Sequence, residues 1–255
     1  MRIDERAVIH PEASLADDIH VGPFSIIEQD VIIESGTKIE SNVVIASGSR
    51  IGQNCRIFPG AVIGTIPQDL KFEGELTTVH IGNNTTVREY CTINRGTKES
   101  GKTVVGDDCL LMAYVHVAHD CVLGDHVILA NAVNMAGHVS IDDWVIIGGL
   151  VPIHQFVRIG THAFIGGGFR VDKDVPPYVM AAGQPLEYKG LNSIGLRRRN
   201  FSPALREKIK SVYRTIYRQG LNKSQALEQL GAEAEEVPEI QEIYRFIKGS
   251  ERGLM

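Results

Sequence analysis

The sequence predicts a mainly β protein, in which a parallel β-helix of hexapeptide repeats is followed by a small C-terminal α-helical domain. Two observations carry this prediction. An aliphatic residue returns at every sixth position through most of the first 175 of the 255 residues, and helical spacing of apolar residues replaces this rhythm near the C-terminus. A hexapeptide period is typical of a parallel β-helix, whose coils bury their apolar rows only against neighbouring coils. We expect residues 1–190 to form the column and residues 191–255 the helical domain.

The first run of repeats begins close to the amino terminus. Its aliphatic residues are Ile9, Leu15, Val21, Ile27, Ile33, Ile39, Ile45, Ile51, Ile57 and Ile63. Because side chains alternate across a strand, the residue two positions earlier also points inward. That position is small, as a narrow interior requires, in Ala13, Ser25, Thr37, Ser49 and Ala61. Glycine often follows the aliphatic residue, and we expect it to form the tight corners between strands.

The rhythm is interrupted twice, at residues 65–78 and 94–103, and we expect a loop to leave the column at each place. Insertions into repeat proteins map to loops that often form the binding face. Asp69 and Lys71 place opposite charges on the first loop. The pattern alone leaves equally open a solvated loop whose charges are incidental.

The second run of repeats is followed by the predicted helices. Its aliphatic residues are Val105, Leu111, Val117, Leu123, Leu129, Met135, Ile141, Ile147, Ile153, Ile159, Ile165 and Val171. Ser202 and Pro203 then form a typical helix start, and apolar spacing predicts a helix over 204–219 that stops at Gly220. Further helices are expected over 224–230 and 238–247.

The composition is that of an ordinary globular protein, with 43% hydrophobic and 22% charged residues. No apolar run is long enough to span a bilayer and the N-terminus lacks an apolar signal core, so we expect a cytoplasmic protein without a transmembrane segment. The net charge of −5 argues against nucleic-acid binding. Cys55, Cys91, Cys109 and Cys121 all occupy the small inward position, which predicts buried thiols without disulfides.

The repeat also predicts a cluster of polar residues on the outside of the column. His119, Gly137 and Gln155 are spaced by one coil of 18 residues, and Asp120 and His138 share the next position. A neutral histidine suits proton abstraction near pH 7, and an adjacent carboxylate can fix its tautomer. The Gly137 N–H is a candidate oxyanion donor. A structural histidine ladder and a metal site remain alternatives on this pattern, although no cysteine or acidic cluster completes a ligand set.

Several strings closely resemble a known family over essentially the full chain. They are Val-His-Val-Ala-His119-Asp-Cys, Ala-Gly-His138, Val-Pro-Ile-His154-Gln-Phe, Gln-Asp69-Leu-Lys71, Asp174-Val-Pro-Pro-Tyr and Arg252-Gly253-Leu254. The family that they resemble is that of the acyl-[acyl-carrier-protein]–UDP-N-acetylglucosamine O-acyltransferases, which begin lipid A biosynthesis. The resemblance implies a left-handed parallel β-helix, although the general rule for parallel crossovers favours the right hand. It also implies a homotrimer with active sites between subunits.

The resemblance further implies transfer of a 3-hydroxyacyl chain from acyl carrier protein to the glucosamine 3-position of UDP-N-acetylglucosamine, without a metal or a cofactor. By this resemblance His119 is the general base, Asp120 orients it, and the Gly137 N–H stabilises the oxyanion. Gly167 falls where the family sets acyl-chain length, and glycine should leave room for a longer chain. Substrate-contacting positions are matched by Asp69, Lys71, His116 and His138, and the nucleotide side by His154, Gln155, Asn192, Arg198 and Arg199.

Two residues depart from the family pattern. Asn94 stands where some members have histidine, and Ile194 stands near the nucleotide site where some have an acidic residue. Both leave open whether the sugar 3-position carries a hydroxyl or an amine, since some members use the 3-amino sugar and form an amide.

Three other readings are weighed beside this one. The N-acyltransferase later in the same pathway carries an additional amino-terminal domain, for which repeats beginning at Ile9 leave no room. A metal-dependent hydratase of this fold would need three convergent histidines. Outside enzymes, the alternative is a non-catalytic trimeric scaffold.

Overall fold

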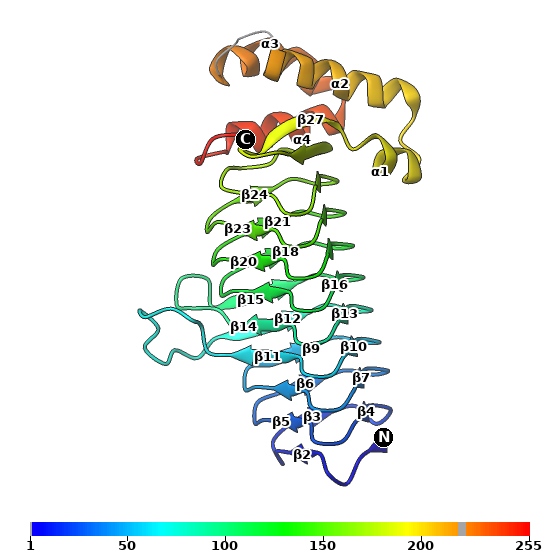
Figure 1. The fold of residues 1–255 in the computed structure, drawn as a ribbon, viewed down its shortest axis with the longest axis vertical. Coiled ribbons are helices and arrows are strands. Elements are labelled where there is room, and N and C mark those ends of the chain that lie inside the picture. Colours follow the sequence, from blue (N-terminus) through cyan, green and yellow to red (C-terminus); the bar gives the residue numbers. More distant parts are fainter. Residues whose placement is uncertain (1, 219–222) are drawn as a thin grey trace.

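A computed structural model describes residues 2–218 and 223–255. Figure 1 shows a tall column of short strands that rises from the N-terminus, with helices gathered at its other end. The column is a left-handed parallel β-helix of hexapeptide repeats, so the mainly β prediction is confirmed. The coils contribute their strands to three sheets, which form the three faces of the column and are parallel except at the β26–β27 pair.

The strands of each sheet follow one another along the column. The first sheet runs in the order β1 (Arg2–Ile3), β4 (His20–Val21), β7 (Lys38–Ile39), β10 (Arg56–Ile57), β13 (Thr86–Val87), β16 (Leu110–Leu111), β19 (Ile128–Leu129), β22 (Ile146–Ile147), β25 (Phe164–Ile165), β26 (Val179–Ala182), β27 (Glu187–Leu191). The second sheet runs in the order β2 (Val8–Ile9), β5 (Ile26–Ile27), β8 (Val44–Ile45), β11 (Val62–Thr65), β14 (Thr92–Asn94), β17 (His116–Val117), β20 (Asn134–Met135), β23 (Pro152–Ile153). The third sheet runs in the order β3 (Ser14–Leu15), β6 (Ile32–Ile33), β9 (Ser49–Ile51), β12 (Thr78–Ile81), β15 (Lys102–Val105), β18 (Val122–Leu123), β21 (Ser140–Ile141), β24 (Arg158–Ile159).

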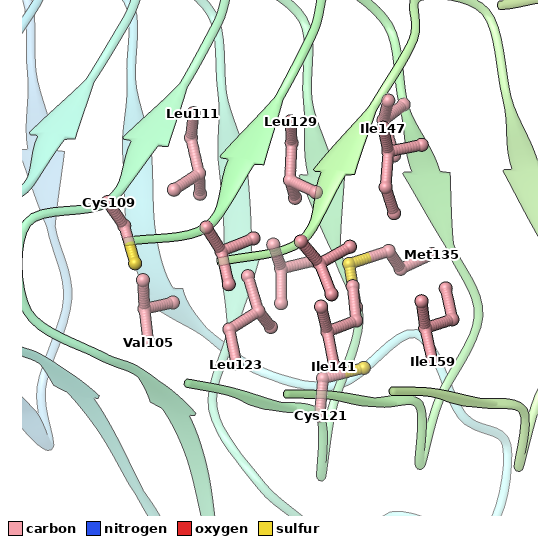
Figure 2. Packing of buried hydrophobic residues seen from close by; sticks show 14 of the residues in the cluster. Val105, Cys109, Leu111, Cys121, Leu123, Leu129, Met135, Ile141, Ile147 and Ile159 are labelled. Atoms are coloured by element: carbon pink, nitrogen blue, oxygen red, sulfur yellow. The ribbon is translucent and has the colours of Figure 1, made fainter. Parts of the chain in front are cut away.

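The interior is filled by the aliphatic residues of the repeat. Figure 2 shows Leu111, Leu129 and Ile147, which come from three successive coils, lying in one row inside the column. All three are completely buried. Burying a side chain of this size contributes about 1.5–3 kcal/mol, and the row repeats this gain at every coil. The four cysteines are also buried free thiols, as predicted, and burial raises the pKa of Cys121 to about 12.

Most of the glycines that follow the aliphatic residues serve a purpose other than the one expected, although Gly64 does have a positive φ of 84°. A Cβ atom at Gly22 would lie 2.8 Å from the backbone of Glu40, and one at Gly106 would lie 2.4 Å from Gly124 O. These glycines therefore allow successive coils to approach closely, and the expectation that they form the corners is wrong for them. Each coil has three corners. At most of them the chain turns at the residue three positions after the aliphatic one, which has a positive φ and is usually not glycine.

This left-handed corner conformation is uncommon for residues other than glycine, although Asp, Asn and His adopt it more often than most. It occurs at Asp120 (φ 59°), His138 (φ 61°) and Phe156 (φ 63°), one above the other at the edge between the second and third sheets. The backbone requirement of the repeat thus places a column of corner side chains along this edge.

The two loops leave the column as residues 66–77 and 95–101, slightly shorter than the predicted interruptions because the flanking strands extend into them. The register is restored after each loop, since Ile57 pairs with Val87 and Val87 with Leu111. In Figure 1 both loops project from the same side of the column.

The last strand of the hexapeptide rhythm is β25, and β26 pairs with it in parallel. Single bridges from Ile153 to Val171 and from Ile159 to Val175 continue the column, and β26 and β27 then form an antiparallel hairpin that periodicity did not predict. The helices are α1 (Ser193–Arg198), α2 (Pro203–Arg218), α3 (Lys223–Glu236) and α4 (Pro238–Lys248).

Helix α1 was not predicted from the sequence, because it is too short to show apolar periodicity. The prediction also ended α3 six residues early, at Gly231, although alanine and glutamate, both good helix formers, follow this glycine and continue the helix. Ser202 caps α2 as predicted, because its Oγ accepts a hydrogen bond of 3.1 Å from Leu205 N. The predicted stop at Gly220 lies outside the described residues.

Buried polar contacts attach the C-terminal part of the chain to the column. Asp174 is 1% exposed and accepts hydrogen bonds from Ser250 Oγ (2.7 Å) and Arg158 N (2.9 Å). The buried Tyr213 of α2 donates its hydroxyl proton to Pro177 O at 2.5 Å. These bonds connect α2 and the segment after α4 to the end of the column.

Candidate active site

A groove of about 820 Å³ runs along the edge where the second sheet passes into the third. The strands and corners of the column form its floor, and the loops 66–77 and 95–101 contribute to its side. Among its lining residues are Asp69, Lys71, Glu99, His116, His119, Gly137, His138, Gln155 and Phe156. The structure therefore brings together most of the residues that the sequence assigned to catalysis and to substrate contact.

His119 and Asp120 form a close pair at the centre of this edge. The distance from His119 Nδ1 to Asp120 Oδ2 is 2.8 Å, and the side chains are 13% and 0% exposed, respectively. Burial alone would raise the pKa of Asp120, but hydrogen bonds from Ser100, His119 and Thr97 outweigh burial and lower it to about 2. The carboxyl group is therefore ionised near neutral pH, where it can only accept hydrogen bonds.

This ionised carboxylate fixes the tautomer of His119. Nδ1 must be the donor in the contact with Asp120, which leaves the lone pair of Nε2 free to take a proton. Asp120 is in turn held by Thr97 N (2.9 Å), Thr97 Oγ1 (2.7 Å) and the hydroxyl of Ser100, and its own N–H donates to Thr103 Oγ1 (2.9 Å). The pair has the arrangement of a general base and its orienting group.

Gly137 lies directly beside the imidazole of His119. A Cβ atom on Gly137 would be 2.6 Å from His119 Cε1 and 2.8 Å from Nε2, so only glycine leaves the ring this position. Within the described residues, the Gly137 N–H donates no hydrogen bond. Its proton is therefore free for a ligand in the groove.

Two further histidines flank the pair. The His138 ring is perpendicular to His119 (centroids 5.1 Å apart) and stacks on Phe156 at 4.5 Å. Its Nε2 lies 3.5 Å from Glu99 Oε2 and 3.7 Å from Asp120 Oδ2. His116 Nδ1 is 2.7 Å from Thr92 Oγ1, and burial, together with the neighbouring His119, lowers the pKa of His116.

Ligand atoms of His119, Asp120 and His138 lie within 4.8 Å of one another, so these three residues could reach a single metal ion. The Asp120 oxygens, however, already accept hydrogen bonds from Thr97, Ser100 and His119. A metal ion at this place would compete with that network for the same lone pairs.

The remaining predicted residues lie beside or away from the groove. His154 is half-buried next to Gln155, with its Nδ1 3.2 Å from Gln155 O. Gly167 is stacked on Gly149, whose carbonyl oxygen would be 3.1 Å from a Cβ atom on Gly167. That contact lies at the edge between the first and second sheets, so one chain does not bring Gly167 to His119.

The predicted nucleotide residues of the C-terminal segment lie near a third edge, between the third and first sheets. Asn192 caps α1 by accepting from Gly195 N (3.1 Å) and donates to His162 O (2.9 Å). Arg199 packs its guanidinium 4.6 Å from the Trp144 ring centroid, while Arg198 is exposed. None of these three residues lines the groove of the same chain.

Several residues of the groove were missed by the sequence reasoning. Thr97, Ser100 and Glu99 lie in the loop 95–101, where no repeat phase indicates which residues face Asp120. Phe156 could have been found, because it stands 18 residues after His138 at the same corner.

His162 is a buried histidine at the third edge. We expect it to make the free energy of unfolding depend on pH. Burial and the nearby Arg199 lower its pKa to about 4 from an ordinary value of 6.5. His162 therefore binds a proton more readily in the unfolded chain than in the folded protein. The stability that neutral His162 contributes is complete above pH 6.5 and is lost as the pH falls towards 4. The loss amounts to about 3 kcal/mol.

The matching measurement is the free energy of unfolding between pH 7 and pH 4, for the wild type and for His162→Phe. We expect the variant to lose about 3 kcal/mol less over this range. Comparing two proteins is necessary because burial raises the pKa of Asp142 to about 6, which acts with the opposite sign. Equal losses in both proteins would contradict the prediction.

Known proteins share both the sequence and the fold of this chain. Residues 174–255 match the model of UDP-N-acetylglucosamine O-acyltransferase domain 2, and residues 30–65 and 102–137 match the bacterial transferase hexapeptide model. A UDP-N-acetylglucosamine acyltransferase structure from Bacteroides fragilis has a TM-score of 0.97 at 50% identity, covering 99% of both chains. One from Francisella novicida has a TM-score of 0.97 at 42% identity, covering 99% of this chain and 93% of its own.

Curated relatives extend this agreement. An acyl-[acyl-carrier-protein]–UDP-N-acetylglucosamine O-acyltransferase from Chlorobaculum parvum is 52% identical, over 98% of this chain and 96% of its own length. A relative of the same name from Ectopseudomonas mendocina is 45% identical, over 99% of this chain and 98% of its own length. No helix among the described residues is long and apolar enough to cross a membrane. With this similarity over nearly the whole chain, the protein belongs to the acyl-[acyl-carrier-protein]–UDP-N-acetylglucosamine O-acyltransferase family.

Proposed function

We propose that this enzyme transfers a 3-hydroxyacyl chain from acyl carrier protein to the glucosamine 3-hydroxyl of UDP-N-acetylglucosamine, the first step of lipid A biosynthesis. The observation that carries the proposal is the His119–Asp120 pair, with its ionised carboxylate and free Nε2, at the floor of a groove. The names of the relatives support the substrates. The four buried free thiols fit a cytoplasmic location, where thiols stay reduced.

In the proposed mechanism His119 Nε2 removes the proton of the sugar 3-hydroxyl as that oxygen attacks the thioester carbonyl. Asp120 keeps Nδ1 protonated and stabilises the imidazolium that forms. The Gly137 N–H donates to the oxyanion of the tetrahedral intermediate. When the intermediate collapses, the carbon–sulfur bond breaks and the imidazolium of His119 gives its proton to the departing thiolate of the carrier protein, which leaves as the free thiol. The proposed steps involve no change of oxidation state, and His119 carries the proton from the sugar hydroxyl to the sulfur.

The sugar nucleotide would be held on both sides of this pair. Asp69, Lys71, His116 and His138 surround His119 in the groove and are the proposed contacts to the sugar and its substituents. His154 and Gln155, two coils beyond His119 along the same edge, are the proposed contacts to the nucleotide.

We propose that the active enzyme is a homotrimer whose sites lie between subunits. The support is geometric, because Asn192, Arg198 and Arg199 lie near an edge of the column other than that of the groove. A neighbouring copy that presents its third edge to this groove would complete the nucleotide side. By the same reasoning, Gly167 would limit the acyl chain from its own edge, and a glycine would leave room for a longer chain.

The C-terminal part offers a basic surface for the acidic carrier protein. Lys189, Lys210 and Arg214 line a hollow of about 370 Å³ between β27 and α2. Glu187 pairs with Lys189, and Glu207 with Lys210 and Arg214, so part of this positive charge is neutralised. Exposed Arg197 and Arg198 add positive charge nearby. Charge complementarity of this kind speeds association, and we expect the transfer rate at low carrier-protein concentration to fall with salt.

The proposal is tested by a transfer assay with purified protein and 3-hydroxyacyl carrier proteins of several chain lengths. UDP-N-acetylglucosamine and its 3-amino analogue are offered as acceptors, and mass spectrometry identifies the product. An ester with the hydroxyl sugar is expected. An amide from the analogue alone would move the assignment to the 3-amino sugar, and no product from a folded trimer would overturn the proposed reaction.

A further inference from the structure

Asn94 is a buried residue that the proposed mechanism does not use. It ends strand β14, is 3% exposed, and pairs with Thr65, the last residue of β11. The ladder register shifts at this pair, because the chain leaves the column after Thr65 to form the loop 66–77. Asn94 therefore lies beside the point where the loop 66–77, which carries Asp69 and Lys71 to the groove, leaves the column. We call this point, Thr65 and Ile66, the root of the loop.

The side-chain amide of Asn94 is bonded to this root. Its Nδ2 lies 3.0 Å from Thr65 Oγ1, 3.1 Å from Ile66 O and 3.4 Å from Thr65 O. All three neighbours are oxygen atoms, so the NH₂ group must face them and the amide oxygen must point away. Removing the amide would take this donor away from Ile66 O and Thr65 Oγ1, whereas Thr65 O would keep the bond from Arg95 N. Loss of a partly buried hydrogen bond costs more than loss of an exposed one.

Other contacts between the two loops are less protected. The half-buried Arg95 donates from its backbone N to Thr65 O (3.1 Å) and places its guanidinium 5.6 Å from the Phe72 ring centroid. Lys98 and Glu73 are 3.7 Å apart, but both are exposed, and such pairs contribute little. Of Asn94, Arg95 and Lys98, only Asn94 is buried.

We infer that Asn94 is a positioning residue for substrate binding: its amide sets the course of the loop 66–77 and thereby the place of Asp69 and Lys71 at the groove. The inference rests on the proposed contact of Lys71 with the sugar nucleotide. Histidine, found here in some relatives, could point only one ring N–H at this root, where asparagine offers two protons from one atom.

The test compares Asn94→Ala, Lys71→Ala and the double variant in the transfer assay. Asn94→Ala is expected to raise the KM for UDP-N-acetylglucosamine about tenfold and to change kcat less than about threefold, because hydrogen bonds of ordinary strength are lost outside the reacting atoms. Asn94→His should recover part of the loss. The double variant should have a KM well below the product of the single effects, since both changes act through Lys71.

A structural readout accompanies the kinetics. Amide hydrogen exchange of residues 66–77 should accelerate in Asn94→Ala but not in Thr37→Val, a control that removes a buried hydroxyl bonded to Gly52 O, far from the groove. Unchanged exchange in the loop, or fully multiplicative KM effects, would overturn the inference. If Lys71→Ala leaves KM unaltered, the proposed substrate contact fails, and loop exchange alone then decides whether Asn94 holds the loop.

Discussion

Replacing His119 by alanine is expected to lower kcat by a factor of about 100 to 10,000, the usual contribution of a general base. The reason lies in the geometry, since His119 Nε2 is the free basic atom of a ring whose Nδ1 is bonded to the ionised Asp120 at 2.8 Å. The KM for the sugar nucleotide should change far less, because proton removal is needed only in the transition state. Steady-state kinetics at saturating acceptor measure both values.

The His119→Ala protein must be shown to be folded, since the ring packs against Gly137 and His138. Far-ultraviolet circular dichroism and the oligomeric state should match those of the wild type. The control is His10→Ala, which removes an exposed histidine that follows β2 in the first coil and should leave kcat unchanged. Near-normal kcat in His119→Ala would remove this residue from the mechanism.

The second large effect is expected from one added methyl group. Gly137→Ala would place a Cβ atom 2.6 Å from His119 Cε1, closer than real carbon contacts allow, so the ring must shift. A displacement of about 1 Å in a catalytic group can cost about a hundredfold in rate, and we expect a loss of kcat of this size. Because alanine keeps the backbone N–H, the loss reports the position of His119 and not the removal of the oxyanion donor.

Gly231→Ala is the matched control for this experiment. Nothing lies within 4 Å of a Cβ atom at Gly231, which is inside helix α3, so the methyl group should leave kcat unaltered. It should also stabilise the helix by up to about 1 kcal/mol, the difference in propensity between glycine and alanine. Wild-type kcat in Gly137→Ala would mean that the imidazole can act from a shifted position.

The interior of this fold was predictable because one period decides both pairing and burial. The spacing of six residues that identified Leu111 and Leu129 from sequence is the spacing that places them in one buried row. The role of the glycines could not be derived in the same way. Whether a glycine is needed for backbone rotation or for close approach depends on the next coil, as the contact of Gly106 with Gly124 illustrates.

The site was predictable to the extent that it follows the repeat. Asp120 and His138 were grouped by their spacing of one coil, and their shared corner conformation explains why both point to the same edge. Thr97 and Ser100, which hold the Asp120 carboxylate, lie in a loop whose path is set by tertiary contacts. The placement of Asn192 and Arg199 away from the groove could not be predicted either, since it depends on which edge receives the C-terminal helices.

The loops of this column show that such a scaffold can gain new functional residues at a small cost in stability. Val87 resumes the row begun by Ile57 although the chain between them includes the whole excursion 66–77. Closing a loop costs chain entropy that grows only with the logarithm of its length, about 0.6 kcal/mol for each doubling. Insertions at these two exits can therefore lengthen and diverge over evolution while the coils above and below stay in register, so selection can alter the groove without redesigning the core.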